Sequence, residues 1–461
     1  MNAVAHTPAL TSRLPQVGTT IFSVMSALAQ QHGAVNLGQG FPDFGCDARL
    51  LDAVNQAMRA GHNQYAPMAG VMALREGIAE KIATLYGRHY DPEREITVTA
   101  GATQAILTAV MAVVQPGDEV ILLDPCFDSY APNVALAGGT AVHVPLNPGT
   151  FAPDFDRIAQ ALSSRTRLII VNTPHNPSGT VWCAADMQRL TELLRPTEVL
   201  VIGDEVYEHM VYDGVPHQSI ARWPELAARS FVVSSFGKTY HVTGWKVGYV
   251  AAPAALTAEF RKVHQFNVFA VNTPVQHGLA AYLRDPQPHL QLAAFYQRKR
   301  DLFAEGLRGT RLRPLPCAGT YFQCADYSAL SDEEDTAFCE RLTREIGVAA
   351  IPMSAFYAHP VQQGLIRFCF AKEDATLTLA LERLRLLSWC GRLGRQKVKL
   401  QVDPGTNRSR GRLRRQGQQQ IDRLGRWWLD LAVIAGQQVE ELQLTQAMQV
   451  KSLRGCSSMN E

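Results

Sequence analysis

The sequence lacks the patterns that mark several common classes of protein. Its nine cysteines are scattered, with no CxxC pair and no His/Cys cluster at zinc spacing, so we expect reduced thiols in a cytoplasmic protein and no metal site. The first twenty residues lack the basic and apolar segments of a secretory signal. The longest apolar run near the end, WWLDLAVIAG, is too short and too interrupted to cross a bilayer.

The chain also has little net charge. A formal charge of +2 over 461 residues gives no strong field toward nucleic acid or a membrane, so we expect neither as a partner. The charge is unevenly spread, because residues 391–426 hold eleven Lys/Arg and only two Asp/Glu. We therefore place a boundary near Trp389 and predict that residues 388–461 form an atypical basic tail, disordered or loosely helical.

Two nucleotide-binding motifs are incomplete. The fragment GKT (237–239) resembles part of a P-loop, but that motif needs a glycine five residues before Gly237, where the chain has Val232. GQGFPDF (38–44) contains G-x-G without the third glycine of a dinucleotide-binding fingerprint. Neither motif supports nucleotide binding.

Short apolar runs alternate with helical patterns through the middle of the chain. We predict strands over 95–100, 118–124, 167–172, 198–204, 230–235 and 247–252, and helices over about 103–114, 184–195, 256–284 and 289–308. Continuous apolar strands alternating with helices predict an α/β fold with a mostly parallel sheet sandwiched by helices. Strand patterns over 320–327 and 364–371, with helical patterns over 335–347 and 374–387, predict a smaller α+β domain.

We accordingly divide the chain into four parts. Residues 1–40 are assigned to an N-terminal arm and part of the small domain, and residues 41–287 to the large domain. Residues 288–387 form the small C-terminal domain, and residues 388–461 form the tail. The length is ample for two domains with substantial cores.

Polar and aromatic residues follow the predicted strands, where open parallel sheets bind their ligands. GATQ (101–104) enters a helix whose free N–H groups suit a phosphate. The other strand ends are followed by Phe127, Tyr130, Asn172, Asn176, Asp204, Tyr207, Ser235, Lys238 and Lys246. A phosphorylated pyridine aldehyde needs this set: a phosphate cup, a stacking ring, a carboxylate for the ring nitrogen and an amine for the aldehyde.

At this point a family resemblance is clear. The motifs HNPSG (175–179), DEVY (204–207) and SSFGKTYHVTGWKVGY (234–249) resemble the class I/II aminotransferases of pyridoxal-phosphate fold type I. With GTTIF, NLGQGFPDF, NQYAPMAG and RKVHQFNVFAVNTP, the chain is most similar to bacterial methionine aminotransferases and to kynurenine aminotransferases, also called glutamine transaminase K. The resemblance covers about residues 13 to 387 and implies pyridoxal 5'-phosphate as the cofactor, bound in the large domain.

The resemblance implies roles for the residues around the cofactor. Lys238 would form the Schiff base and shuttle protons, and Asp204 would hold the pyridine nitrogen. Asn176 and Tyr207 would donate to the phenolic oxygen, and Phe127 would stack on the ring. The expected phosphate ligands are Ala102, Thr103 and Gln104 through backbone N–H groups, together with Ser235 and Lys246.

The resemblance also implies a substrate site and a partner subunit. Arg367 in LIRFCF would clamp the substrate carboxylate, assisted by Gly40 and Asn176, with Tyr130 also at the substrate. Tyr65 in NQYAP is similar to a tyrosine that reaches the phosphate of the neighbouring subunit, so a homodimer with shared active sites is expected. Phe41, Tyr65, Phe127 and Phe269 are candidate pocket walls, whereas His175 and His241 are expected to be neutral and outside the chemistry.

The resemblance favours transfer of the amino group of methionine, or of another neutral amino acid, to a 2-oxo acid by ping-pong kinetics. No second arginine marks a site for a side-chain carboxylate. A cysteine-S-conjugate β-lyase would share every cofactor residue and stays open as an alternative. A regulator with a fused DNA-binding module is disfavoured, because no helix-turn-helix pattern precedes the domain and the basic tail has no recognisable fold signature.

Overall fold

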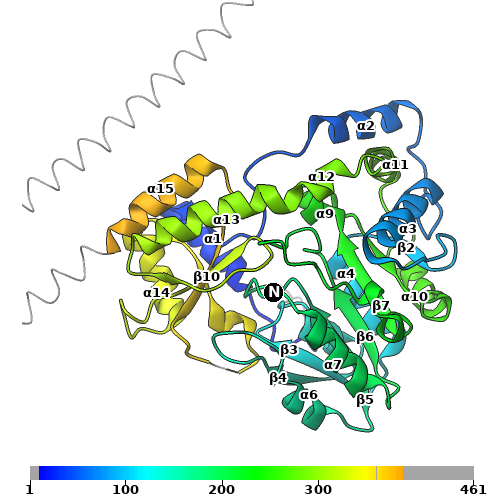
Figure 1. Ribbon diagram of the computed structural model, residues 1–461, viewed down its shortest axis with the longest axis horizontal. Helices are drawn as coiled ribbons and strands as arrows, with labels where there is room; N and C mark the ends of the chain where they lie inside the picture. Colours follow the sequence, from blue (N-terminus) through cyan, green and yellow to red (C-terminus); the bar gives the residue numbers. More distant parts are fainter. Residues whose placement is uncertain (1–9, 360, 388–461) are drawn as a thin grey trace, which may run out of the picture. The chain divides into compact units, whose positions relative to one another are not determined.

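The computed structural model describes residues 10–359 and 361–387 (Figure 1), so the predicted tail lies outside the described residues. The central element is a seven-stranded sheet in the order β2-β8-β7-β6-β5-β3-β4. Its strands are β2 (Ile96–Thr99), β3 (Glu119–Asp124), β4 (Thr140–Pro145), β5 (Thr166–Asn172), β6 (Leu200–Asp204), β7 (Ser230–Ser235) and β8 (Gly248–Ala251). In the spatial order β7-β6-β5-β3-β4, each strand is parallel to the next. Strand β8 runs in the opposite direction to all the others, because it is antiparallel to both β7 and β2. The predicted α/β fold with a mostly parallel sheet is therefore confirmed.

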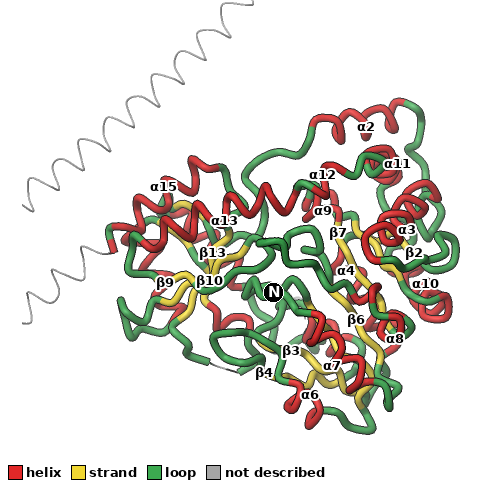
Figure 2. Tube along the Cα trace, viewed as in Figure 1, coloured by secondary structure: helices red, strands yellow, loops and turns green. Residues whose placement is uncertain are grey.

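Both faces of the sheet are buried under helices, which explains the continuous apolar strands. Alternate residues of β5 point to opposite sides: Ile170 packs in the core under α4 (Ala102–Val113) and α10 (Ala254–Asn267), while Ile169 packs in the core under α7 (Ala184–Leu194). Figure 2 shows the helices distributed around the strands. The other helices of this part are α2 (Ala48–Arg59), α3 (Met72–Tyr86), α5 (Tyr130–Leu136), α6 (Phe155–Ala161), α8 (Pro224–Ala227), α9 (Phe236–Thr239), α11 (Thr273–Tyr282), α12 (Gln287–Leu290) and the 3-10 helices Ile220–Arg222 and Thr243–Trp245.

Two sequence predictions need correction here. Strand β4 was not predicted, because it is an edge strand whose residues are mostly half-buried or exposed, so it lacks a continuous apolar signal. The single helix predicted over 256–284 is two helices, α10 and α11. The chain between them turns at Phe269, whose φ is +67°, and Asn272 starts α11 by accepting a hydrogen bond from the Val275 N–H.

A second, smaller group of elements surrounds a four-stranded antiparallel sheet. Its strands, in spatial order, are β12 (Ile351–Pro352), β13 (Leu365–Cys369), β10 (Phe322–Asp326) and β9 (Arg313–Pro314). The helices here are α1 (Ile21–Gln31), α13 (Leu292–Arg308), α14 (Asp335–Arg341), a π-helix over Leu342–Ile346, a 3-10 helix over Met353–Phe356 and α15 (Asp374–Arg385).

The N-terminal segment joins this smaller group. Strand β1 (Val35–Asn36) pairs in parallel with β11 (Val348–Ala349), and Met25 of α1 is fully buried in the same core. These contacts agree with placing part of residues 1–40 in the small domain. The domain boundaries themselves stay predictions. None of the helices in the described ranges combines the length and apolar character needed to cross a membrane.

Candidate active site

A cavity of about 240 Å³ lies at the carboxyl ends of the parallel strands, between the large sheet and the smaller group of elements. It collects most of the residues singled out from the sequence. The predicted site residues that line it are Gly40, Ala102, Thr103, Phe127, Asn176, Asp204, Tyr207, Ser235, Lys238, Lys246 and Arg367. Gln104, Tyr65 and Tyr130 are not among its lining residues.

Lys238 enters the cavity from α9, directly after β7. Its Nζ donates to the Gly40 carbonyl at 3.1 Å and to the Tyr321 hydroxyl at 2.9 Å. Burial, with the positive charges of Arg367 and Lys246, lowers the pKa of Lys238 to about 8. A substantial fraction of the amine is therefore neutral near physiological pH, as a nucleophile or proton acceptor must be.

The start of α4 forms a cradle for an anion. Gly101 turns the chain with φ +81°, and the first N–H groups of the helix have no partner within it. The Lys246 Nζ lies 3.6 Å from the Cβ position that Gly101 leaves empty. A Cβ on Gly248 would lie 2.6 Å from the Ser234 carbonyl oxygen and 3.2 Å from the Ala102 nitrogen, so only glycine allows β8 this close to the helix start.

Gln104 supports this cradle through its side chain but does not line the cavity. Its side-chain oxygen accepts from the Ala100 N–H at 2.9 Å, and its amide donates to the Thr108 hydroxyl at 2.6 Å. The first bond fixes the turn that precedes the helix, and the second holds the Gln104 side chain against α4. Only its backbone N–H, at the third position of α4, remains as a candidate anion donor.

Asp204 ends β6 and is 4% exposed. Burial raises its pKa to about 6, although hydrogen bonds from Tyr130 and from the Val206 N–H lower it. The Tyr130 hydroxyl donates to Oδ2 at 2.5 Å. We expected Tyr130 at the substrate, but it is 2% exposed and lies behind the carboxylate, which it orients.

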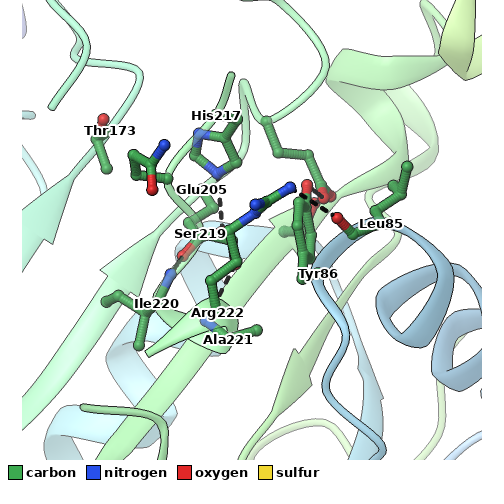
Figure 3. Close-up of polar contacts among 12 residues, drawn as sticks. Leu85, Tyr86, Thr173, Glu205, His217, Ser219, Ile220, Ala221 and Arg222 are labelled. Carbon is green, nitrogen blue, oxygen red and sulfur yellow. Dashed lines mark hydrogen bonds and ion pairs between the residues drawn. The ribbon is translucent and has the colours of Figure 1, made fainter. Parts of the chain in front are cut away.

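The turn after β6 is anchored on its opposite side by a second carboxylate. Glu205 accepts from the Ile220 N–H at 2.8 Å, and its other oxygen is 3.0 Å from His217 Nε2 (Figure 3). Glu205 is 1% exposed. Successive residues of the turn therefore face different environments, with Asp204 and Tyr207 on the cavity and Glu205 in the buried network.

Glu208 completes this buried network. It accepts from Lys81 Nζ at 2.6 Å, from the Tyr86 hydroxyl at 2.6 Å and from the Ser234 hydroxyl at 2.5 Å. Burial alone would raise the pKa of Glu208, but the Lys81 ammonium holds it well below its usual range. The DEVYE turn (204–208) is thus fixed by two hydrogen-bonded carboxylates that do not line the cavity.

Arg367 lies on β13 and is 1% exposed. Nη1 donates to the Asn176 side-chain oxygen at 2.8 Å and Nη2 to the Gly38 carbonyl at 3.1 Å, while Nε has no partner among the described residues. Its guanidinium lies 3.9 Å from the centre of the Phe322 ring. A buried cation without a carboxylate partner in the described structure is suited to bind a carboxylate ligand.

Sequence reasoning missed three residues near the reactive centre. Tyr321, which holds Lys238, directly precedes β10, Phe322 is the first residue of β10, and Phe22 comes from α1. None follows a parallel strand, so the rule used on the sequence could not find them. Only their aromatic character gave a signal, and aromatic residues at these places are equally typical of a core.

The candidate pocket walls separate into two groups. Phe41 and Phe127 line the cavity. Tyr65 is 84% exposed, and its ring contacts Phe269, which is 42% exposed, with ring centroids 5.5 Å apart. These two residues therefore form a surface pair and do not reach the cavity of their own chain.

The two histidines near the site match the expectation of neutral groups. Burial lowers the pKa of both His175 and His241 to about 4, so both are uncharged at pH 7. Neither histidine lines the cavity.

The residues present fit a phosphorylated pyridine cofactor. An anion cradle with an adjacent lysine, a ring at its side, a buried carboxylate and a neutralisable amine occupy one cavity. The unpaired Nε of Arg367 adds a place for a second, carboxylate-bearing ligand. The arrangement suits chemistry in which a proton is moved at a carbon next to an amino and a carboxylate group.

Comparison with known proteins identifies relatives that match most of the described residues. The family model for aminotransferase class I and II matches residues 32–384. The methionine aminotransferase of Escherichia coli is 54% identical over 377 residues, which is 82% of this chain and 98% of that protein. The human kynurenine–oxoglutarate transaminase 1 is 36% identical over 393 residues, 78% of this chain and 93% of that protein.

Solved structures agree with these sequence relatives. The E. coli YbdL structure, described as having a methionine aminotransferase function, superposes with a TM-score of 0.81 at 53% identity, covering 82% of this chain and 100% of that one. N-succinyldiaminopimelate aminotransferase from Mycobacterium tuberculosis superposes with a TM-score of 0.80 at 42% identity, covering 82% and 100%.

Proposed function

The chain belongs to the class I and II aminotransferases, and on that premise we propose that it moves the amino group of methionine, or of another neutral amino acid, to a 2-oxo acid. The observation that carries this proposal is the placement of Lys238, Asp204 and an unpaired Arg367 around one cavity. Arg367 is the one arginine that lines this cavity in the described residues. A neutral side chain on the substrate therefore suits the site better than an acidic one.

We propose pyridoxal 5'-phosphate as the cofactor, in keeping with the family. When bound, it supplies an electron sink for the pair of electrons left when the substrate Cα–H bond breaks. The start of α4, Ser235 and Lys246 would hold its phosphate, Asp204 its ring nitrogen, and Asn176 and Tyr207 its phenolic oxygen. Phe127 would cover the ring, and Lys238 would carry the attachment.

The chain's own residues account for the remaining steps. Arg367 binds the substrate carboxylate by two parallel hydrogen bonds, which orients the Cα–H bond toward Lys238. The neutral Nζ of Lys238 accepts this proton and later returns it, and Tyr321 and the Gly40 carbonyl hold Nζ in place. Phe22, Phe41 and Phe322 narrow the cavity and exclude water.

The proposal includes a cytoplasmic homodimer. The cysteines in the described residues are all free thiols, as in a reducing compartment. Tyr65 and Phe269 are exposed apolar side chains in contact with each other, and a second subunit would bury them. Tyr65 would then reach the phosphate in the partner's cavity.

A substrate screen tests the proposed function. The purified full-length chain, loaded with cofactor, should convert methionine with an acceptor 2-oxo acid, and should act less well on aspartate or glutamate than on methionine, phenylalanine or glutamine. Amino acid products are measured by chromatography. Release of pyruvate and ammonia from a cysteine conjugate without any acceptor would instead favour the β-lyase, and inactivity toward every pair would contradict the proposal.

Asp204→Asn should reduce kcat by roughly 10²–10³-fold at nearly unchanged shape, because the neutral amide no longer stabilises positive charge on the ring nitrogen. Stopped-flow measurement of each half-reaction checks this. Asp156→Asn is the control, since the Asp156 side chain is 89% exposed and does not line the cavity. A near-normal rate for Asp204→Asn with cofactor bound would remove Asp204 from this role.

Tyr321→Phe should lower kcat/KM by about tenfold, because it deletes one of the two hydrogen bonds that hold Lys238 Nζ in place. Tyr296→Phe is a close control: Tyr296 is fully buried, its ring lies 5.6 Å from that of Tyr321, and its hydroxyl has no partner among the described residues. Steady-state kinetics should therefore separate the two variants. Equal losses in both would show that packing, not the hydroxyl of Tyr321, matters here.

A further inference from the structure

Three side chains able to bind a metal meet outside the cavity. Asp124 is the last residue of β3, Cys126 follows it in the loop, and His143 lies on the adjacent parallel strand β4. One ligand atom from each lies within 4.8 Å of the other two. No motif spacing in the sequence indicates this cluster, because the pairing of β3 with β4 brings His143 to the other two residues.

The geometry of the cluster is close to that of a zinc site. His143 Nδ1 and Asp124 Oδ1 are 2.9 Å apart, and Asp124 Oδ2 accepts from the Ala358 N–H at 3.1 Å. Zinc–ligand bonds of about 2.0–2.3 Å place tetrahedral ligand atoms roughly 3.3–3.8 Å apart. To admit an ion, the imidazole must therefore move slightly away from the carboxylate, and the Cys126 sulfur, which lies within 4.8 Å of both, must approach to about 3.8 Å or less. The Ala358 contact holds the carboxylate during this change.

Burial and charge favour a cation at this place. Asp124 is 4% and Cys126 8% exposed, whereas the His143 side chain is 18% exposed and offers a path to solvent. The Asp124 carboxylate supplies the negative charge of the cluster. One sulfur, one imidazole and one carboxylate are a donor set that suits Zn²⁺ and not Mg²⁺ or Ca²⁺.

We propose that Asp124, Cys126 and His143 bind one Zn²⁺ ion per chain, with a water molecule as the fourth ligand on the His143 side. On binding, Cys126 releases its thiol proton to solvent. His143 binds as neutral imidazole through Nδ1 and carries its proton on Nε2. The proposal is independent of the proposed function, because none of the three residues lines the cavity.

The binding test uses the full-length chain with its cofactor, freed of metal by a chelator and dialysis. Zn²⁺ is titrated against a chromophoric chelator that competes for the ion. Wild type should bind one tight Zn²⁺ per chain, and Cys126→Ala and His143→Gln should each weaken it by at least about tenfold. Cys183→Ala is the matched control, because Cys183 is an exposed thiol outside the cluster; its affinity should equal that of wild type.

X-ray absorption at the zinc edge tests the ligands directly. Wild type with one equivalent of Zn²⁺ should show one sulfur at about 2.3 Å, and Cys126→Ser should show only nitrogen and oxygen neighbours. Unchanged affinity in both cluster variants, or a zinc-bound sulfur that persists in Cys126→Ser, would overturn the site. Circular dichroism without zinc confirms that each variant folds, and His143→Gln, at the half-buried edge, decides the matter if the cysteine variants do not fold.

Discussion

Replacing Lys238 with alanine is expected to abolish transamination, with a loss in kcat of at least about 10⁴-fold. The variant loses the proton carrier, which alone contributes about 10²–10⁴-fold, and it also loses the amine that attaches the cofactor. Activity is followed with methionine and a 2-oxo acid. Borohydride reduction and peptide mass spectrometry should find the cofactor on Lys238 in wild type and on no peptide of the variant.

The pH dependence of cofactor loading gives an independent check on Lys238. Only the neutral amine attacks an aldehyde, so the loading rate of the cofactor-free chain should rise with pH and level off above the pKa of Lys238, about 8. With an unperturbed lysine, the loading rate would level off only above about pH 10.4. Lys262→Ala, which removes an exposed lysine paired with Glu259, should behave as wild type. Substantial turnover by Lys238→Ala would refute the assignment.

Arg367→Ala is expected to lower kcat/KM for methionine by roughly 10²–10⁴-fold. Each charge-assisted hydrogen bond to the substrate carboxylate is worth about 1.5–3 kcal/mol, and the variant loses a pair. Arg367→Lys should also be badly impaired, because an ammonium keeps the charge but cannot present two parallel donors. The fold should survive alanine, since the change removes a buried charge that has no carboxylate partner in the described structure.

A substrate without the carboxylate separates recognition from cofactor chemistry. Wild type and Arg367→Ala are compared on methionine and on 3-(methylthio)propylamine, the same molecule without its carboxylate. The variant should lose far more activity toward methionine than toward the amine. Arg313→Ala, which removes an exposed arginine paired with Asp326, should leave both rates unchanged. If Arg367→Ala reduces both rates equally, the carboxylate is bound elsewhere.

The residues that follow parallel strands could be placed from the sequence. Strand polarity puts the carboxyl ends of β3, β5, β6 and β7 at one edge, so Phe127, Asn176, Asp204 and Lys238 had to gather there whatever the details of packing. The strands themselves were recognisable because both faces of the sheet are buried. Edge strand β4 could not be recognised in this way, because most of its residues are half-buried or exposed.

Residues that depend on packing between distant segments could not be placed in this way. The Tyr321 hydroxyl reaches Lys238 only because the segment before β10 folds over the sheet, and no local pattern encodes this approach. Tyr130 illustrates a different limit: its position after β3 was foreseen, but not that its hydroxyl would turn to Asp204. The direction of one side chain depends on neighbours that are distant in sequence.

The two-sided DEVYE turn limits how this site could be transplanted. A designer who copied residues 204–208 onto another sheet would import Glu205 and Glu208 along with the cavity residues, and without their partners each would be a buried, uncompensated acid costing about 3–5 kcal/mol. Substitutions of Glu208 and of its partner Lys81 are therefore coupled. Replacing both with apolar residues should lower the free energy of unfolding far less than replacing either alone.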